Sequence, residues 1–235
     1  MTSLQIAAKL NNMEIVHLLL SHPKIEIGSN SFKECNNLKE ITIPSTITFI
    51  GQCAFCGCSL IKQITIPSSV TSIENGAFSR CIALTEIEIP SSITVINDNT
   101  FYGCSSLVKV LIPSSITSIG CSVFEYCNSL SQIEIPSSVK SIGGRTFGGC
   151  SSLKNIAIPS SVTEIKPYTF FGCSSLSQVQ IPSSVTLIGN NAFEGCLLLK
   201  NMQIPSSVKD IGENALPYVN NKNSDSDQNS NCLIF

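Results

Sequence analysis

Cysteine is the residue type with the greatest capacity for chemistry in this chain, which has twelve cysteines among 235 residues. Three lie close together in Cys53-Ala-Phe-Cys56-Gly-Cys58, and thiolates at such spacings are common zinc ligands. No second ligand pair follows at finger-like spacing, and both histidines, His17 and His22, lie far upstream. We therefore expect two surface thiols and a buried Cys58, with no metal and no cofactor. A soluble metal-regulated or redox adaptor that uses Cys53 and Cys56 is kept as an alternative.

Serine is abundant, but no arrangement of residues for nucleophilic catalysis can be recognised. A serine hydrolase needs a nucleophile, a base and an orienting carboxylate in one place. The serines recur at fixed spacing, whereas a catalytic site would break the repetition. Gly143-Gly144 and Gly148-Gly149 do not form the G-x-x-x-x-G-K-[ST] phosphate loop. We therefore expect that this protein is not an enzyme and has no catalytic residue.

Composition excludes several other classes of protein. Apolar residues make up 43% and charged residues only 13%, which supports a large core, and the formal charge of −2 gives no positive field for nucleic acid. No apolar stretch reaches the roughly 18 to 20 residues that cross a bilayer. Residues Met1 to Leu10 lack the basic and apolar regions of a secretory signal, so we expect residence in the cytosol.

The elements that position these residues come from an internal repeat of 23 residues, which accounts for eight of the twelve cysteines. Proline, phenylalanine and cysteine each recur with this step, the prolines from Pro44 to Pro205 and the cysteines from Cys35 to Cys196. Stacked repeats would place these cysteines side by side with parallel side chains, in a reducing compartment. We therefore expect a ladder of buried thiols.

Each repeat unit predicts a short strand that ends at its proline. In the unit from Leu153 to Cys173, Ile156 and Ile158 alternate with polar residues, and Pro159 ends the pairing because it lacks an N–H donor. A second extended or turning segment and a short helical turn should follow, which gives seven inward positions per unit. Burial of six large side chains yields about 1.5–3 kcal/mol each, whereas ordering costs about 1.5 kcal/mol per residue. A single unit therefore cannot fold alone, and stacking into a solenoid is the stable solution.

The pattern Leu-x-x-Ile-x-Ile-Pro-x-x-Val-x-x-Ile-Gly-x-x-Ala-Phe-x-x-Cys resembles the BspA-type leucine-rich repeat over about Ser31 to Pro217. The resemblance implies a parallel sheet along one face, short turns or 3-10 segments on the other, and a binding or adhesive role without catalysis. Ordinary leucine-rich repeats have an asparagine ladder after the strand, which is absent here. Ser or Thr stands two residues after each proline, from Thr46 to Ser207, and we expect these hydroxyls to form an alternative hydrogen-bonded ladder.

Before the solenoid, residues 2 to about 27 resemble most of one ankyrin repeat. Apolar residues fit two short amphipathic helices that are broken at Asn11-Asn12. One such unit is too small to be stable alone, so we expect a helical cap on the first coil. A separate recognition surface or a dimerisation patch is the alternative. The expected domains are 1–29 (ankyrin-like helical cap), 30–217 (solenoid) and 218–235 (tail).

The tail from residue 218 to 235 is polar and predicts a flexible linker. It ends in Cys232-Leu233-Ile234-Phe235, which matches the C-a-a-X signal for prenylation, with the lipid on Cys232. A terminal Phe favours geranylgeranyl. Stable attachment usually takes a second signal, such as a polybasic patch, and none is evident in this sequence. We therefore expect reversible or avidity-assisted membrane binding.

The outward positions of the predicted strands form a ribbon, which is the usual binding face of a leucine-rich solenoid. Most of these positions are uncharged and polar, which a merely solvated sheet face would also show. The middle of the ribbon differs, because acidic residues surround one lysine and one outward leucine. We expect a protein partner to bind there, at Glu86, Glu88, Lys109, Leu111, Gln132 and Glu134.

Taken together, the sequence predicts a non-enzymatic scaffold for protein–protein interaction, anchored by a prenyl group to the cytosolic face of the plasma membrane or another membrane, with a cytoplasmic pool. Its expected partners are a protein on the sheet face and the membrane, with homo-oligomerisation also open and nucleic acid excluded. The alternative is a cell-surface adhesin that binds host or matrix protein, which the missing signal sequence disfavours.

Overall fold

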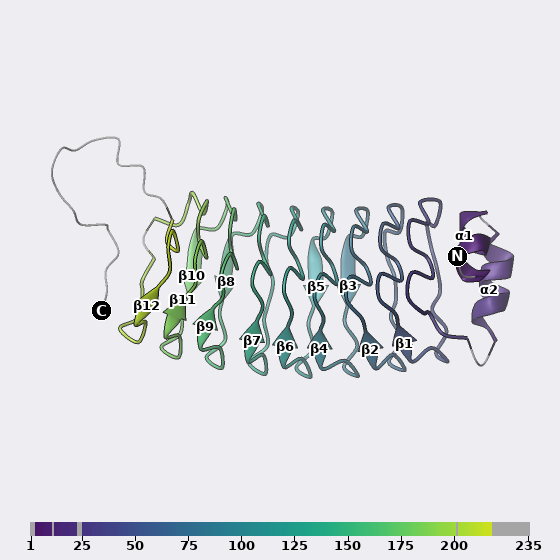
Figure 1. The fold of residues 1–235 in the computed structure, drawn as a ribbon, viewed down its shortest axis with the longest axis horizontal. Helices are drawn as coiled ribbons and strands as arrows, with labels where there is room; N and C mark the ends of the chain where they lie inside the picture. Colours follow the sequence, from purple (N-terminus) through teal and green to yellow (C-terminus); the bar gives the residue numbers. More distant parts are fainter. Residues whose placement is uncertain (1–2, 11, 23–24, 201, 218–235) are drawn as a thin grey trace.

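The computed structural model describes residues 3–10, 12–22, 25–200 and 202–217. These residues form an elongated solenoid of stacked coils with two short helices at its N-terminal end (Figure 1). The helices are α1 (Ser3–Lys9) and α2 (Met13–Leu20). The expected repeat solenoid with parallel sheets and a small helical N-terminal unit is therefore confirmed.

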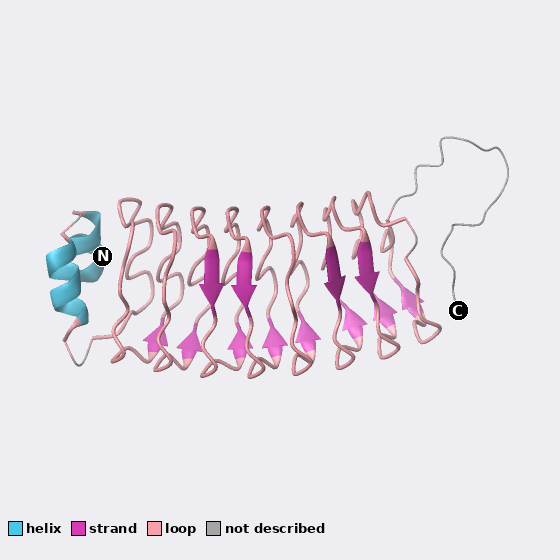
Figure 2. Cartoon of the chain, turned by 180° about the vertical axis from the view of Figure 1, so that it is seen from behind, coloured by secondary structure: helices cyan, strands magenta, loops and turns pink. Residues whose placement is uncertain are grey.

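Two ladders of parallel strands run along the solenoid, and Figure 2 shows them as two rows of arrows. The first ladder lies just before the repeat prolines. The sequence predicts such a strand in every unit, and the structure has it in four of the described units, as β3 (Glu86–Glu88), β5 (Lys109–Leu111), β8 (Asn155–Ala157) and β10 (Gln178–Gln180). Strand β3 pairs with β5, and β8 pairs with β10, each with the register of one repeat.

The second ladder follows the proline turn. It consists of β1 (Phe49–Ile50), β2 (Ser72–Ile73), β4 (Val95–Ile96), β6 (Ser118–Ile119), β7 (Ser141–Ile142), β9 (Glu164–Ile165), β11 (Leu187–Ile188) and β12 (Asp210–Ile211). Its sheets are β1-β2, β4-β6-β7 and β9-β11-β12. The sequence left this segment as extended or turning, because strands of two residues are too short for an alternating pattern to be recognised.

The core consists of columns of identical residues from successive coils. The repeat phenylalanines, from Phe32 to Phe193, are fully buried and stack with ring centroids 5.0–5.7 Å apart and interplanar angles of 2–16°. In the unit from Leu153 to Cys173 all seven expected inward positions are buried. An eighth inward position, which the sequence interpretation did not include, is the residue before each phenylalanine, such as Thr169, which is 2% exposed.

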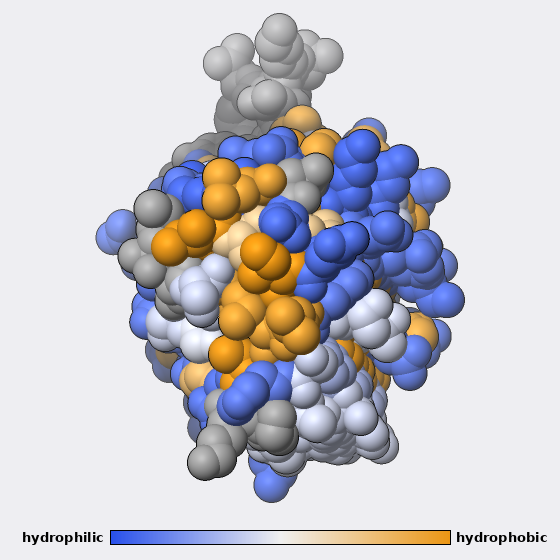
Figure 3. Space-filling view, turned by 90° about the vertical axis from the view of Figure 1, so that its right-hand side faces the viewer, coloured by the Kyte–Doolittle hydropathy of each residue, from blue (hydrophilic) through white to orange (hydrophobic). Residues whose placement is uncertain are grey.

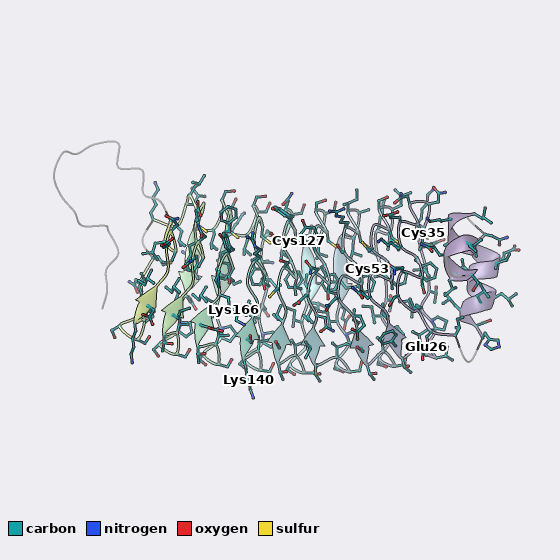
Figure 4. All side chains as sticks on the ribbon, in the orientation of Figure 1. Glu26, Cys35, Cys53, Cys127, Lys140 and Lys166 are labelled. Atoms are coloured by element: carbon teal, nitrogen blue, oxygen red, sulfur yellow. The ribbon has the colours of Figure 1, made fainter. Side chains whose placement is uncertain are left out.

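Buried thiols form a second column, as expected. Each repeat cysteine from Cys58 to Cys196 donates its S–H to the carbonyl of the phenylalanine 26 residues earlier, with S···O distances of 3.0–3.3 Å. Cys127, labelled in Figure 4, is one member of this column. All cysteines of the described residues are free thiols.

The expected ladder of hydroxyl groups two residues after the prolines, which we call the serine ladder, is also confirmed. The hydroxyls donate to backbone carbonyls of the preceding coil, 22 residues earlier, so the ladder joins neighbouring coils. In six coils the O···O distance is 2.5–2.8 Å, and Ser161 donates to Val139 in the same way. The six serines are Ser69, Ser92, Ser115, Ser138, Ser184 and Ser207.

The third side of each coil consists of turns, and no 3-10 helix is assigned in the described parts of the chain. We call this side the turn face and define it as residues 30–34, 53–57, 76–80, 99–103, 122–126, 145–149, 168–172 and 191–195. The first and last residue of each segment have positive φ, between 54° and 78°. Backbone hydrogen bonds join its coils as well, such as that from Phe124 N to Thr146 O at 2.9 Å.

The two helices cover the N-terminal end of the solenoid. Asn12 caps α2, with its side chain accepting from the Ile15 amide at 3.1 Å. Leu4 and Ala8 of α1 and Val16 and Leu20 of α2 are buried in one hydrophobic cluster with the coils. The two predicted helices and their covering role are therefore confirmed. Domain boundaries at 29/30 and 217/218 remain predictions, and Cys232 lies outside the described residues.

Candidate interaction surface

The outward side chains of the first ladder are exposed where the sequence predicts. Both β3 and β5 have a buried central residue between two exposed ones, which places Glu86, Glu88, Lys109 and Leu111 on the outside. Leu111 is 46% exposed, which is unusual for a large apolar residue in a strand. The alternation follows from strand geometry, since successive side chains point to opposite faces.

Register places these four residues in two neighbouring pairs. Glu86 lies opposite Lys109, and Glu88 lies opposite Leu111. The Gln63 side chain donates to Oε1 of Glu86 at 2.9 Å, which orients this carboxylate. Glu88 lies beside the exposed leucine.

These residues line an open hollow of about 620 Å³ on the sheet face. Its wall includes Gln63, Thr65, Glu86, Glu88, Lys109 and Leu111. The other two expected binding residues, Gln132 and Glu134, are exposed on the next coil, which has no assigned strand, and they do not line the hollow. The structure therefore brings together four of the six. Such a surface can recognise a partner by charge and by one apolar contact.

The thiols near Cys53 differ in environment. Cys58 is buried, and burial raises the pKa of its thiol far above the ordinary value. Cys53 and Cys56 are half-buried, as the sequence led us to expect for surface thiols. Burial raises the pKa of Cys56, the nearby Cys53 thiol raises it further, and a hydrogen bond with Ser79 lowers it. In the described part of the chain no group of three or more His, Cys, Asp or Glu residues could hold a metal ion.

The turn face carries residues that the sequence interpretation missed. Both arginines of the chain and three of its four tyrosines lie on it: Arg80, Arg145, Tyr102, Tyr126 and Tyr168. The available signal was a break in the repeat, because Arg80 and Tyr126 stand where the neighbouring coils have Gly57, Gly103 and Gly149. Their positive φ angles of 58° and 61° cost about 1–2 kcal/mol each relative to glycine.

The outer side of the helices presents a further apolar area. Leu10 and Leu18 are 75% and 71% exposed, and Ile6 and Ile15 are also exposed. Figure 3, which looks onto this end of the solenoid, shows an apolar area with a polar surround. Neither helix is long and apolar enough to span a bilayer, a finding that covers only the described residues.

Comparisons with known proteins give one family and several similar structures. The family model of the BspA type leucine rich repeat region (6 copies) matches residues 25–154 and 96–224. A leucine rich repeat protein of T. pallidum is 29% identical, with a TM-score of 0.53, over 74% of this chain and 71% of that one. A leucine rich cell surface protein of Faecalibacterium prausnitzii A2-165 is 25% identical, with a TM-score of 0.50, over 80% and 76%. No curated protein sequence gives a significant match.

Proposed function

Because this chain belongs to the BspA-type leucine-rich repeat family, we propose that it is a non-enzymatic scaffold that binds a protein partner on the face formed by β3 and β5. The single observation that carries this proposal is the hollow lined by Glu86, Glu88, Lys109 and Leu111. Its two carboxylates outnumber its one ammonium group. The partner segment should therefore present a basic side chain toward the glutamates and an apolar side chain toward Leu111.

The proposal extends to Gln132 and Glu134 at the rim of the same face. They add a third exposed carboxylate one coil further along the solenoid. A partner in extended conformation that crosses the coils would reach them after it passes the hollow. Rim charges mainly change the association rate and its salt dependence, so Glu134→Lys should have a smaller effect than the same change at Glu88.

Charge reversal tests this face. The full chain and its Glu86→Lys/Glu88→Lys variant are incubated in parallel with an extract of native cells and with host or matrix protein, and the bound proteins are quantified by mass spectrometry. Specific partners should fall at least about tenfold with the variant, which corresponds to about 1.4 kcal/mol. The matched control is Glu164→Lys, an exposed reversal on β9 of the second ladder. Equal recovery with all three proteins would refute the proposal.

Two locations are proposed for such a scaffold. The similar F. prausnitzii protein is described as a cell surface protein, which favours the adhesin at the cell surface. The cytosolic, prenyl-anchored scaffold is supported only by the four C-terminal residues from Cys232 to Phe235. We place the surface adhesin first for this reason.

Two measurements separate these locations. Protease added to intact cells should cleave a surface adhesin and spare a cytosolic scaffold. Mass spectrometry of the native C-terminal peptide should find an unmodified Phe235 terminus in the first case. In the second case it should find geranylgeranyl on Cys232 with the last three residues removed, and membrane binding should be lost in Cys232→Ser.

Homo-oligomerisation through the helical cap is a further part of the proposal. The exposed residues Ile6, Leu10, Ile15 and Leu18 support it, because contiguous apolar patches of this kind mark interaction sites. Light scattering during gel filtration should give the mass of a dimer for the full chain and of a monomer for Leu10→Glu/Leu18→Glu. A monomer for both proteins would refute it.

A further inference from the structure

The turn face departs from its own repeat at the last residue of each segment. Its segments end at a left-handed residue, and from residue 34 to 149 this row alternates between a large residue and glycine. The row reads Glu34, Gly57, Arg80, Gly103, Tyr126 and Gly149. The following two coils have Gly172 and Gly195, both with positive φ, so glycine is sufficient for the fold at this position.

The alternating glycines give the large side chains room to lie flat on the next coil. A Cβ built on Gly149 would lie 2.6 Å from Cδ1 of Tyr126, and one on Gly103 would lie 3.4 Å from Cγ of Arg80. Both side chains therefore pack against the backbone of a glycine in the next coil, and their outer edges are exposed to solvent. Residues held in a strained left-handed conformation without a structural need are candidates for function.

Arg80 and Tyr126 lie close to a further aromatic side chain, Tyr102. Tyr102 and Tyr126 contact each other edge to face, with ring centroids 5.7 Å apart, and the Arg80 guanidinium lies 6.0 Å from the Tyr102 ring centroid. Tyr126 is 48% exposed. Tyrosine and arginine, together with tryptophan, are enriched among the residues that carry most of the binding energy of protein interfaces.

A hollow of about 400 Å³ lies beside Arg80 on the same face. Its charged lining is Lys33, Glu34 and Arg80, and Cys56 and Tyr102 are also part of it. The two ion pairs of the described residues are Arg145–Glu125 and Lys166–Glu164, so Arg80 has no carboxylate partner among these residues. The hollow thus has a net positive charge, opposite to that of the sheet-face hollow.

We propose that the turn face is a second protein-binding surface, on which the hollow beside Arg80 receives a carboxylate side chain of the partner while an adjacent apolar side chain packs on Tyr102 and Tyr126. An arginine with a free guanidinium fork matches a carboxylate in geometry and charge. The net charge of the whole chain, −2, disfavours a polyanion such as nucleic acid as the occupant. This surface would bind independently of the face formed by β3 and β5, so one scaffold could join two proteins.

A random peptide library displayed on phage, panned against the full chain, tests this surface. Enriched sequences should contain Asp or Glu next to an aromatic or aliphatic residue. Synthetic peptides from the enriched set should lose at least about tenfold in affinity with Arg80→Gly, since interface arginines of this kind are frequent hot spots. Because glycine is the residue of the neighbouring coils, this variant should keep the fold and a melting temperature equal to or above that of the wild type.

Two control variants make the outcome specific. Glu34→Gly lies in the same row and lines the same hollow, but it removes a repelling carboxylate, so the peptides should bind equally well or more tightly. Glu86→Lys/Glu88→Lys should leave the same peptides unaffected, which separates this surface from the proposed sheet-face function. The proposal is overturned if no peptide is enriched, if Arg80→Gly leaves the affinity unchanged, or if only the sheet-face variant weakens binding.

Discussion

Removal of one hydroxyl from the serine ladder is a sensitive test of how the coils are held together. The Ser138 hydroxyl donates to the carbonyl of Ile116 at 2.7 Å, across the boundary between two coils. Ser138→Ala deletes this hydrogen bond and leaves the carbonyl without its donor at a partly buried position. A typical intramolecular hydrogen bond contributes about 0.5–1.5 kcal/mol, and a carbonyl left unsatisfied adds to the loss. We expect a loss of about 1–2 kcal/mol in the free energy of unfolding.

The assay is urea unfolding followed by circular dichroism, with the thermal midpoint as a second readout. For a chain of this size, each 1 kcal/mol should lower the melting temperature by about 2–4 °C. The matched control is Ser137→Ala, one residue earlier and exposed, for which we expect a change within about 0.5 kcal/mol. An equal effect of the two substitutions, or none from Ser138→Ala, would show that the ladder does not stabilise the stack.

Three further predictions concern the core, the turns and the thiols. Phe124→Ala should cost about 3–5 kcal/mol in urea unfolding, because a fully buried ring of the stack is removed; a loss under 1 kcal/mol would contradict this packing. Gly143→Ala should lower the free energy of unfolding by more than about 2 kcal/mol, because its Cβ would lie 2.4 Å from the Cys121 amide nitrogen. The control Gly28→Ala should be neutral in the same assay, because its Cβ would meet no atom closer than 3.9 Å. Burial raises the pKa of Cys104, Cys150 and Cys196 from the ordinary 9.0 to about 12, so the unfolded chain loses these protons first. The stability is therefore complete below pH 9 and should fall between pH 9 and 12 by up to about 1.4 kcal/mol per pH unit for each thiol, as measured by urea unfolding against pH; a flat profile would contradict it.

Much of the fold follows from the sequence because each inward position recurs in every coil. Ile156, Ile158 and Phe170 show the period of the strand and the spacing of the turn, and the structure buries all three. The second ladder could not be predicted as strand, because Glu164–Ile165 and its equivalents are only two residues long. Pairing with neighbouring coils, which the local sequence does not encode, makes them strands.

The candidate sites were predictable to different degrees. Alternation in β3 and β5 was sufficient to place Glu86, Glu88, Lys109 and Leu111 on the surface. Their arrangement around one hollow required the register between coils, which only the structure supplies.

The turn face was missed for a different reason. Arg80 and Tyr126 occupy turn positions with a positive φ, where neighbouring coils have glycine. A search of the sequence for recurring inward-facing apolar residues does not consider such positions. The left-handed conformation and the bare glycines of the next coil become evident only when the coils are stacked.

Site-specific photo-cross-linking in native cells, with host or matrix protein added in a parallel sample, tests the central claim most directly. A photoreactive amino acid is placed at Leu111 in the sheet-face hollow and, as a control, at the exposed Thr163 beside the second ladder. Our account predicts a discrete protein adduct from position 111 that is absent from position 163 and disappears with Glu86→Lys/Glu88→Lys. No adduct at position 111, or the same adducts from both positions, would contradict a protein-binding face at β3 and β5.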